Sequence, residues 1–510
     1  MNRREFLKGT AWMGAAAFAA GCQLNRFGFG EGGQMQNYCY RKLMGKKIRV
    51  GFVGIGGRGT GAVHRVAQIP GCEVVALCDK DPARVEVNLA WLREQKYSKI
   101  DSIKTYVGDE AYKDLCDFGE CDVIYCATPW ALHQPVGLRA LCGGKVALIE
   151  VTSALTVDQC WELVEASEKF QIPCMQLENC VYGEIELLEL HLARLGMFGE
   201  INHAEGAYIH DLRGIIPSSC KYNGEAKWRY QENMVHKGDR YPTHGLVPLC
   251  QTMGINRGDR LDYLVSLDSG AYNTNYEKFK KEFLGDDDPR KNDPPAEMGD
   301  MTTTLIKTAK GKSIMVQHDV SSPRPYNRLA FISGTKGAMG DYPFRCAFEE
   351  KCFDSKAHEW FDEKAANEIR AKYMHPLWKN VSDVAQKIGG HGGMDFIMDA
   401  RMVYCLQNGL PLDMDVYDLA EWCCLAELGT LSMDNNCAAV DFPDFTRGYW
   451  NVEKGFRHAY ASPEDEANAA AAAKASTEAQ KELTIKKKLW EKYDKEKAKK
   501  AKKAAKAEKK

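Results

Sequence analysis

The chain has 510 residues, of which 45% are hydrophobic and 27% are charged. This length is enough for a large core and is typical of two or three domains. The formal net charge is −2, so the overall charge gives no indication of a nucleic-acid partner. The C-terminal end differs from the rest, because residues 481–510 carry fourteen Lys against five Asp or Glu.

The N-terminus has the features of a targeting segment. Arg3 and Arg4 precede an apolar run of small residues, Ala11 to Ala20, which is too short for an ordinary transmembrane helix. The pattern resembles a twin-arginine export signal. Residues 19–22 then resemble a bacterial lipoprotein box, although Ala stands where Leu is usual. We therefore expect export by the twin-arginine machinery to the periplasm or to an outer-membrane anchor, with lipidation of Cys22 and simple cleavage both open.

The pattern of the chain changes several times after this signal, which would occupy residues 1–22. Residues 23–46 lack periodicity and are interpreted as a tether. Residues 47–178 alternate short β-rich runs with helical stretches, as expected for an α/β domain with a parallel sheet. Residues 179–455 predict a second, α+β domain with an open, mostly antiparallel sheet. Residues 456–510 are rich in Ala, Lys and Glu with little apolar face, which predicts a solvated helix or disorder.

The expected elements can be given by range. The first domain should have strands at Ile48–Val53, Glu73–Cys78, Asp122–Ala127, Val146–Ile149 and Ile172–Met175, and helices at Thr60–Gln68, Pro82–Gln95 and Leu155–Lys169. The second domain should have strands at Ile201–Tyr208, Met301–Thr308, Ser313–Asp319 and Arg328–Ser333, and helices at Gly393–Leu406 and Val416–Ser432.

A glycine motif follows the first expected strand and opens a helix. Gly54, Gly56 and Gly59 have the G-x-G-x-x-G spacing that gives a tight turn, room for a pyrophosphate and close helix–strand packing. The helix N-terminus then faces the phosphates with its partial positive charge. Asp79 closes the second strand, where a carboxylate accepts hydrogen bonds from the adenosine ribose and repels a 2′-phosphate. The motif predicts a Rossmann domain that binds NAD rather than NADP, although Arg58 could instead meet a phosphate.

Further side chains follow the later strands, at the edge of a parallel sheet where ligands bind. Trp130 and His133 come after the fourth strand, Glu150 ends the fifth, and Asn179 follows the next. Each alone is as consistent with a loop cap as with a ligand contact. Their shared position predicts contacts with the nicotinamide end of the cofactor. No CxxC pair or histidine cluster indicates a structural metal, so we expect none.

These residues are part of a longer resemblance. Residues 48–79, with Thr128-Pro129 and His133, resemble the glucose–fructose oxidoreductase family of sugar dehydrogenases. Within it, the chain is most similar to the glycoside hydrolase family 109 type, the NAD-dependent N-acetylhexosaminidases, over roughly residues 47–452. The narrower resemblance lies in Gly56–Gly59, Trp130–His133, Glu150-Val151, Glu178-Asn179 with Tyr182, Trp228-Arg229, Tyr241–Gly245 and Pro325–Arg328.

One departure from the parent family separates the two branches. Ordinary members have Lys directly after the Glu that ends the fifth strand, and that Lys serves the hydride chemistry. This chain has Val151 after Glu150. The missing amine favours the hydrolase branch, which also lacks the Lys, and implies that Val151 lies beside Glu150 at the cofactor.

The resemblance implies redox-neutral removal of terminal N-acetylgalactosamine from glycans. C3 of the sugar would lose hydride to NAD, the C2 proton would be removed, the group at C1 eliminated and water added, and hydride would return to C3. NAD would therefore be tightly bound and not consumed. This suits a protein that is exported already folded, because a cofactor acquired in the cytoplasm can travel with the fold.

The same resemblance assigns roles in the sugar site. We expect His244 to transfer a proton at the sugar, since imidazole exchanges protons near neutral pH. Tyr182 and Tyr326 are candidates for the C2 proton or for hydroxyl contacts, and Arg229 could supply the cation that a phenol needs to act as a base. The substrate pocket is expected to include Arg229, Tyr326, Tyr208, Tyr241, Pro242, Thr243 and His244. The pair His210-Asp211 has weaker support, and His191, His203 and His318 are interpreted as structural.

Two other functions stay open. One is an NAD(P)-dependent sugar oxidoreductase with net hydride transfer, and the other is a cofactor-bearing binding protein on the envelope without turnover. Val151 disfavours the oxidoreductase, and the set of Tyr, His and Arg residues disfavours the binding protein. The sequence leaves the anomeric linkage and the choice between galacto and gluco sugars open. Association of the parent family through the open sheet implies a homodimer.

Overall fold

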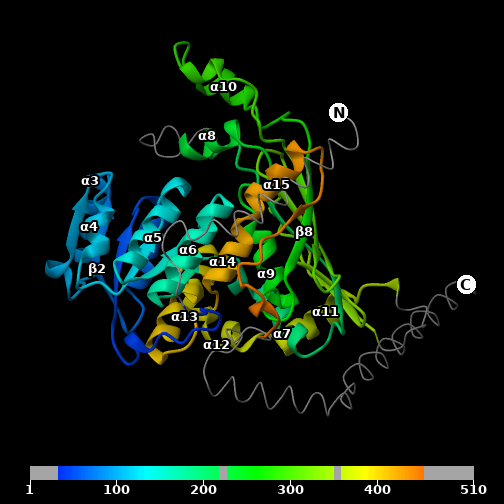
Figure 1. Ribbon diagram of the computed structural model, residues 1–510, viewed down its shortest axis with the longest axis horizontal. Helices are drawn as coiled ribbons and strands as arrows, with labels where there is room; N and C mark the ends of the chain where they lie inside the picture. Colours follow the sequence, from blue (N-terminus) through cyan, green and yellow to red (C-terminus); the bar gives the residue numbers. More distant parts are fainter. Residues whose placement is uncertain (1–32, 217–226, 350–357, 453–510) are drawn as a thin grey trace, which may run out of the picture.

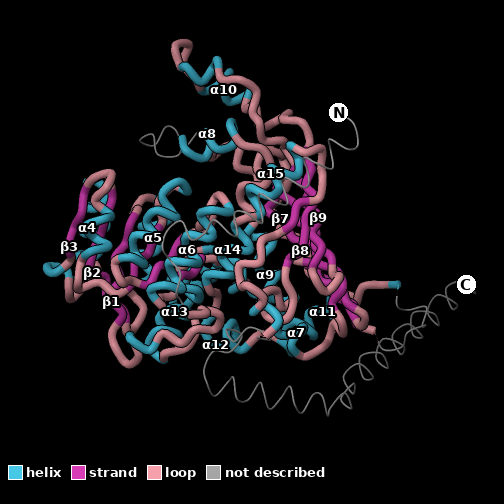
Figure 2. The backbone as a smooth tube through the Cα atoms, viewed as in Figure 1, coloured by secondary structure: helices cyan, strands magenta, loops and turns pink. Residues whose placement is uncertain are grey.

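The computed structural model describes residues 33–216, 227–349 and 358–452 (Figure 1). The predicted signal with Cys22, the first part of the predicted tether and the Lys-rich tail lie outside these residues. None of the helices in the described ranges is both long enough and apolar enough to cross a membrane. Figure 2 shows the strands in two separate groups, with helices between them.

The first group is a six-stranded parallel sheet in the order β3-β2-β1-β4-β5-β6. Its strands are β1 (Ile48–Val53), β2 (Cys72–Asp79), β3 (Lys104–Val107), β4 (Val123–Cys126), β5 (Val146–Ile149) and β6 (Cys174–Gln176). The central strands are apolar on both faces because helices cover both sides of the sheet. The strand order reverses between β1 and β4, and the carboxyl ends of these strands are where such sheets bind ligands.

The helices of this domain follow the strands in turn: α2 (Gly57–Val66), α3 (Pro82–Glu94), α4 (Tyr112–Asp117), α5 (His133–Cys142) and α6 (Val157–Phe170). Local sequence explains two of their starts. Asp81 caps α3 by accepting a hydrogen bond from the amide of Ala83, and Pro82 takes the first helical position. Thr156 caps α6 through the amide of Gln159. The predicted Rossmann domain is confirmed, with β3 as a strand that the sequence analysis did not include.

The second group is an eight-stranded sheet in the order β13-β12-β11-β7-β10-β9-β8-β14. Its strands are β7 (Ile201–Ile209), β8 (Leu261–Asp268), β9 (Thr302–Thr308), β10 (Ser313–Asp319), β11 (Phe331–Gly334), β12 (Gly337–Gly340), β13 (Arg345–Phe348) and β14 (Val440–Asp441). The neighbours β7 and β10 pair in parallel, and the other pairs are antiparallel. The expected open, mostly antiparallel sheet is therefore confirmed as a mixed sheet.

The helices of the second part are α7 (Glu184–Arg194), α8 (Lys227–Val235), α9 (Thr243–Met253), α10 (Glu277–Phe283), α11 (Glu363–Tyr373), α12 (Pro376–Ile388), α13 (Met394–Asn408), α14 (Val416–Cys423) and α15 (Leu425–Asp434). The helix expected at Val416–Ser432 is thus divided at Cys424. Short 3-10 turns lie at Arg41–Leu43, Ile100–Ser102, Trp130–Leu132, Asn179–Tyr182, Pro289–Asn292, His391–Gly393 and Tyr449–Asn451.

Helix α13 returns to the Rossmann domain although it lies late in the chain (Figure 1). It packs on α2 and β1, and its Asp399 accepts a hydrogen bond of 2.7 Å from Nε of Arg65 on α2. Both side chains are buried. A buried charge needs a partner, so this ion pair fixes α13 against the cofactor side of the first domain.

Residues 33–46, predicted as part of a tether, instead pack against both domains. The amide of Met35 donates to the Tyr417 hydroxyl at 3.1 Å, and Gln171 at the end of α6 donates to the carbonyl of Gly33 at 2.8 Å. Met35, Tyr40 and Leu43 are buried in the main core. The tether interpretation is therefore wrong for these residues, because three apolar side chains spaced along the segment give it a surface to bury.

Candidate functional site

The turn between β1 and α2 leaves backbone exposed at the carboxyl edge of the sheet. Gly54 has φ +80°, and a Cβ there would lie 2.8 Å from backbone atoms of Ala127. A Cβ on Gly59 would overlap the carbonyl oxygen of Gly54. Gly56 precedes α2, whose free amides face the turn. Only glycine fits at positions 54 and 59, and the bare helix N-terminus suits the pyrophosphate of a dinucleotide.

Asp79 ends β2 beside this turn and is 9% exposed. Its Oδ2 accepts a hydrogen bond of 2.8 Å from the amide of Ile55, and its Oδ1 accepts one of 3.0 Å from the amide of Asp81. A carboxylate has about four acceptor positions, so the two oxygens retain capacity for ribose hydroxyls. The carboxylate also fixes the glycine turn, a second role that the sequence analysis did not include.

Arg58 lies in the first turn of α2 and is already neutralised. Its Nε donates to Oε1 of Glu150 at 2.6 Å, and its Nη1 donates to Oδ2 of Asp395 at 2.5 Å. Burial lowers the pKa of Arg58, but the charges of Glu150 and Asp395 outweigh that effect, and the pKa is raised well above its usual value. A guanidinium held by two carboxylates is poorly placed to bind a 2′-phosphate, which agrees with NAD as the cofactor.

The residues that follow β4, β5 and β6 do meet at one edge of the sheet. Trp130 donates from its indole nitrogen to the carbonyl of Val151 at 3.1 Å. Asn179 donates to Oδ1 of Asp395 at 2.7 Å. The two ring nitrogens of His133 each lie 2.7 Å from a carbonyl oxygen, one of Thr128 and one of Thr152. Burial lowers the pKa of His133, and a neutral imidazole donates to only one of these carbonyls, so the ring lies between the loops after β4 and β5 and its contact with the cofactor stays a prediction.

An aromatic cluster adjoins this edge. The ring of Tyr241 stacks on Trp130 with centroids 5.7 Å apart, and Tyr208 lies 4.8 Å from Tyr241. Trp228 meets Trp130 edge-on at 4.8 Å. The Arg229 guanidinium lies 4.9 Å from the Tyr241 ring and 5.2 Å from the Trp130 ring. No carboxylate pairs with Arg229 among the residues that the structure describes. Its charge is therefore available to a ligand beside the rings.

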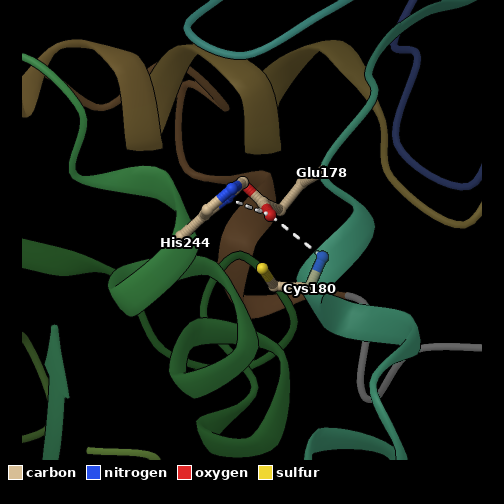
Figure 3. Close-up of side chains that lie close together, drawn as sticks. All are labelled: Glu178, Cys180 and His244. Carbon is tan, nitrogen blue, oxygen red and sulfur yellow. Dashed lines mark hydrogen bonds and ion pairs between the residues drawn. The ribbon is translucent and has the colours of Figure 1, made fainter. Parts of the chain in front are cut away.

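His244 is the second residue of α9. It faces Glu178, which follows β6 (Figure 3). The distance from His244 Nδ1 to Glu178 Oε1 is 2.7 Å, and His244 Nε2 lies 3.4 Å from the Tyr241 hydroxyl. Burial raises the pKa of the Glu178 carboxyl, but the charge and hydrogen bond of His244 outweigh burial, and the pKa is lowered. The carboxylate is therefore ionised, and Pro242 and Thr243, both buried, fix the turn that presents His244.

Cys180 completes a group of three potential metal ligands with Glu178 and His244, whose ligand atoms lie within 4.8 Å of one another. Sequence spacing could not reveal this group. Burial raises the pKa of the Cys180 thiol well above its usual value, so the sulfur is held as a neutral thiol. Because Glu178 and His244 contact each other directly, the arrangement is that of a carboxylate and an imidazole with a thiol beside them.

The ring of Tyr326 lies beside that of Tyr208, with centroids 6.4 Å apart, and the Tyr326 side chain is 37% exposed. Its hydroxyl accepts a hydrogen bond of 3.0 Å from Arg328, which is itself held by Oε1 of Glu186. Burial raises the pKa of Tyr326, and the charge and hydrogen bond of Arg328 oppose that rise. The Tyr208 hydroxyl is hydrogen-bonded to Nδ1 of His210 at 2.9 Å. His210, which had weaker support from the sequence, therefore also belongs to this cluster.

Tyr182 does not join the cluster through its hydroxyl. The side chain is fully buried, and the hydroxyl donates to Oδ2 of Asp413 at 2.9 Å. Asp413 is also paired with Arg401 on α13. Burial, with Asp413 next, raises the pKa of Tyr182 well above its usual value. The predicted catalytic role of Tyr182 thus meets a physical objection, because a buried phenol that donates to a carboxylate cannot readily act as a base.

Three carboxylates of the site were missed as functional residues. Glu178 follows β6 much as Glu150 follows β5, so its position at the edge of the sheet is a signal that the sequence carries. Asp239, whose Oδ1 accepts from the amide of Tyr241 at 2.8 Å, lies two residues before the motif that carries His244. Asp395 gave no local signal, because its partners Arg58 and Asn179 lie far from it in the sequence.

Comparison with known proteins agrees with this geometry. The family "Glycosyl hydrolase 109, C-terminal domain" matches residues 182–452, and "Oxidoreductase family, NAD-binding Rossmann fold" matches residues 48–176. Glycosyl hydrolase family 109 protein 5 of Phocaeicola vulgatus is 46% identical over 467 residues, which cover 88% of this chain and 87% of that protein. Glycosyl hydrolase family 109 protein 1 of Bacteroides thetaiotaomicron is 46% identical over 429 residues, 81% and 88% of the two chains.

Among solved structures, a levoglucosan dehydrogenase in complex with NADH and levoglucosan is similar with a TM-score of 0.58 and 17% identity, over 78% of this chain and 99% of that one. A likeness at this identity concerns the fold alone. The resemblance given by the sequence motifs is confirmed at the level of both domains, and the first domain is an NAD-binding Rossmann domain. The chain belongs to glycosyl hydrolase family 109.

Proposed function

We propose that the protein removes terminal N-acetylgalactosamine from glycans without net oxidation, with an NAD that stays bound. The observation that carries the proposal is the stacking of Trp130 on Tyr241, with centroids 5.7 Å apart. It joins the cofactor edge of the Rossmann domain to the acid–base group at His244. Hydride transfer and proton transfer can therefore act on one sugar ring.

When bound, NAD supplies the hydride acceptor and then the hydride donor for C3 of the sugar. His244 takes the proton of the C3 hydroxyl through Nε2 as the C3 hydride leaves, and it returns that proton when hydride comes back. Arg229, with its guanidinium over the Tyr241 ring, binds the sugar oxygens at the rim. The carbonyl formed at C3 acidifies the C2 proton, so that loss of this proton expels the group at C1.

Tyr326 is the tyrosine that we assign to the C2 proton. Arg328 donates to its oxygen at 3.0 Å, and this cation opposes the rise in the pKa of Tyr326 that burial causes, whereas Asp413 adds to the rise at Tyr182. Its exposed position beside Tyr208 supports access to substrate. Water then adds at C1 and the proton returns to C2, which balances the hydrolysis. Val151 supports this pathway over a plain dehydrogenase, because its apolar side chain packs in the aromatic cluster where an amine would be needed.

The test is release of nitrophenol from α- and β-nitrophenyl N-acetylgalactosaminide by the purified mature protein, with no NAD added. We expect release without accumulation of NADH, and NAD in the denatured supernatant in about equal amount to protein. No release, together with steady NADH formation from free sugars and added NAD, would assign the chain to the sugar oxidoreductases instead. Parallel glucosaminide substrates identify the preferred sugar.

The proposal extends to location and assembly. The pair Arg3 and Arg4 supports twin-arginine export, and replacing both by Lys should retain the protein in the cytoplasm. Radiolabelled palmitate incorporation that a Cys22→Ser change abolishes would establish the lipid anchor. A homodimer through the open face of the eight-stranded sheet is supported by the exposed side chains of Tyr263, Leu267 and Leu305, and light scattering measures it.

A further inference from the structure

Glu178 is a buried carboxylate whose donors converge on one oxygen. The side chain is wholly inaccessible to solvent. Its Oε1 lies 2.7 Å from Nδ1 of His244 and accepts a hydrogen bond of 3.0 Å from the amide of Cys180 (Figure 3). An ionised carboxylate is stable in such a place only with hydrogen-bonding or charged partners. The contact with Glu178 therefore fixes the orientation of the His244 imidazole.

This contact decides which nitrogen of His244 carries a proton. Nδ1 lies 2.7 Å from a carboxylate oxygen without an aligned hydrogen bond, and a lone pair on Nδ1 would face that negative charge, so the contact favours a proton on Nδ1. Neutral imidazole has a single N–H, and Nε2 is then left with a lone pair. Nε2 lies 3.4 Å from the Tyr241 hydroxyl, on the side of the aromatic cluster. In this tautomer the Tyr241 hydroxyl donates to the lone pair of Nε2, which lies on the side of the sugar pocket proposed above, with the carboxylate behind it.

We propose that Glu178 is the positioning residue of the site, which holds His244 as the Nδ1–H tautomer and leaves Nε2 to exchange protons with the substrate. The identity of the substrate rests on the proposed function, whereas the tautomer does not. Glu178 is not itself a catalytic residue, because its burial keeps it from any ligand. The arrangement follows the logic of a carboxylate that orients a catalytic histidine in hydrolases.

The proton balance is complete within this arrangement. Bound NAD would accept the hydride of sugar C3, and His244 would take the proton of the C3 hydroxyl at Nε2 as that O–H bond breaks. His244 becomes an imidazolium whose charge the Glu178 carboxylate offsets at 2.7 Å. When hydride returns to C3, the same proton returns to the oxygen. No other oxidant or base is needed for this half of the cycle.

The experiment compares Glu178→Gln, Glu178→Leu and Glu178→Asp in the full-length holoenzyme. The matched control is Glu189→Gln on α7, because Glu189 is equally buried and neither of its oxygens has a hydrogen-bond partner. Three readouts are taken: kcat and KM for nitrophenol release, the amount of bound NAD, and ring-nitrogen NMR shifts with 15N-labelled histidine. The signal of His244 is assigned by its loss in His244→Gln.

We expect Glu178→Gln to lower kcat by about 10²-fold with KM changed less than about threefold, since only the proton-transfer step is affected. Glu178→Asp should recover about tenfold of that loss, and Glu189→Gln should match the wild type. Bound NAD should stay constant throughout. In the wild type, Nδ1 of His244 should carry the proton at neutral pH, and in Glu178→Leu this preference should disappear.

Several results would overturn the proposal. A wild-type His244 protonated at Nε2 with a bare Nδ1 contradicts it, as does a Glu178→Gln variant with wild-type kcat. Stoichiometric zinc in the wild type that Glu178→Gln loses would assign Glu178, Cys180 and His244 to a metal site instead. If the wild type releases no nitrophenol, the proposed function fails, and the NMR shifts still decide the role of Glu178.

Discussion

Two buried His–carboxylate pairs flank the ring of Tyr208, and they differ in charge. Tyr208 lies 5.3 Å from His244 and 6.1 Å from His318, measured between ring centroids. In the first pair Glu178 and His244 are in direct contact, with Oε1 and Nδ1 2.7 Å apart. In the second pair Asp239 and His318 are 4.0 Å apart, which is too far for direct contact.

The pKa directions follow this difference in distance. Burial is the largest effect on Asp239 and raises its pKa to about 7, against the opposing hydrogen bond of the Tyr241 amide. Burial, followed by the charge of Arg229, lowers the pKa of His318 to about 3. Glu178 has the opposite direction, because its contact with His244 outweighs burial. The buried carboxylate that touches a histidine thus stays ionised, and it lies beside the histidine that we propose to move protons.

The largest expected effect separates the two histidines. His244→Gln should lower kcat for nitrophenol release by about 10²–10⁴-fold, the usual contribution of a general acid–base group. His318→Gln should lower it by less than about tenfold, because a neutral histidine that lacks a carboxylate hydrogen bond supports packing. Circular dichroism and bound NAD check that both variants are folded. Equal losses in the two variants would remove the functional distinction between the pairs.

A third buried carboxylate, Asp395, differs from both pairs because three basic side chains surround it. Asp395 contacts Arg58 at 2.5 Å and His391 at 2.9 Å, with Arg65 at 3.5 Å. Burial raises the pKa of Asp395, but the hydrogen bond of His391 and the charges of both arginines lower it overall. Asp395→Asn should cost about 3–5 kcal/mol in the free energy of unfolding, because buried Arg65 and half-buried Arg58 lose a counter-charge.

Urea denaturation of purified protein measures this cost. The matched control is Glu110→Gln, which breaks the exposed pair of Glu110 with Lys113 and should not change the transition measurably. Release of NAD at lower urea concentration than unfolding is expected in Asp395→Asn, since Arg58 and Asn179 both lose a contact that fixes the cofactor edge. A variant as stable as the wild type would mean that Glu150 alone neutralises Arg58.

The sequence predicts those parts of the molecule whose physics is local. The turn at Gly54–Gly59 and the carboxylate of Asp79 follow from steric and electrostatic needs within a single βαβ unit. The central strands follow from continuous apolar runs. In contrast, β3 is largely exposed and β12 contains two glycines in four residues, so neither has an apolar pattern. Their strand pairing comes from neighbours in the sheet.

The sequence predicts many of the residues that form the site, but it does not predict which of them pair with one another. The resemblance named His244 and Tyr182 together, whereas the structure gives His244 to Glu178 and Tyr182 to Asp413. Both partners lie far away in sequence, and no periodicity links them. The same holds for Asp395, which belongs to the second domain and completes the cofactor edge of the first.

The pair of Asp239 and His318 predicts how the free energy of unfolding depends on pH. The folded-state pKa of Asp239 is raised to about 7, so the folded chain holds a proton that the unfolded chain releases above about pH 4. Stability from this group is present below that pH and is lost as pH rises toward 7. The pKa of His318 is lowered to about 3, so its contribution is present above about pH 6.5 and is lost as pH falls.

In the wild type these two slopes oppose each other between about pH 4 and 6.5, and single substitutions should separate them. Relative to the wild type, Asp239→Asn should gain stability as pH rises through this window, and His318→Gln should gain stability as pH falls. Each slope should be at most about 1.4 kcal/mol per pH unit. Chemical denaturation at several pH values measures both variants. Parallel pH profiles would show that neither group titrates differently on folding.

The smallest expected effect concerns Tyr182, which the resemblance assigns to catalysis and the structure to a buried network. Tyr182→Phe removes one hydrogen bond to Asp413, which keeps its pairing with Arg401. The free energy of unfolding should therefore fall by about 1 kcal/mol, the typical net value of such a bond, and kcat should stay within about threefold. Tyr326→Phe is the counterpart, because its hydroxyl is near the substrate pocket and its loss should lower kcat by at least about tenfold. If Tyr182→Phe instead abolishes nitrophenol release with stability unchanged, the hydroxyl must leave Asp413 during turnover, and the C2 proton belongs to Tyr182.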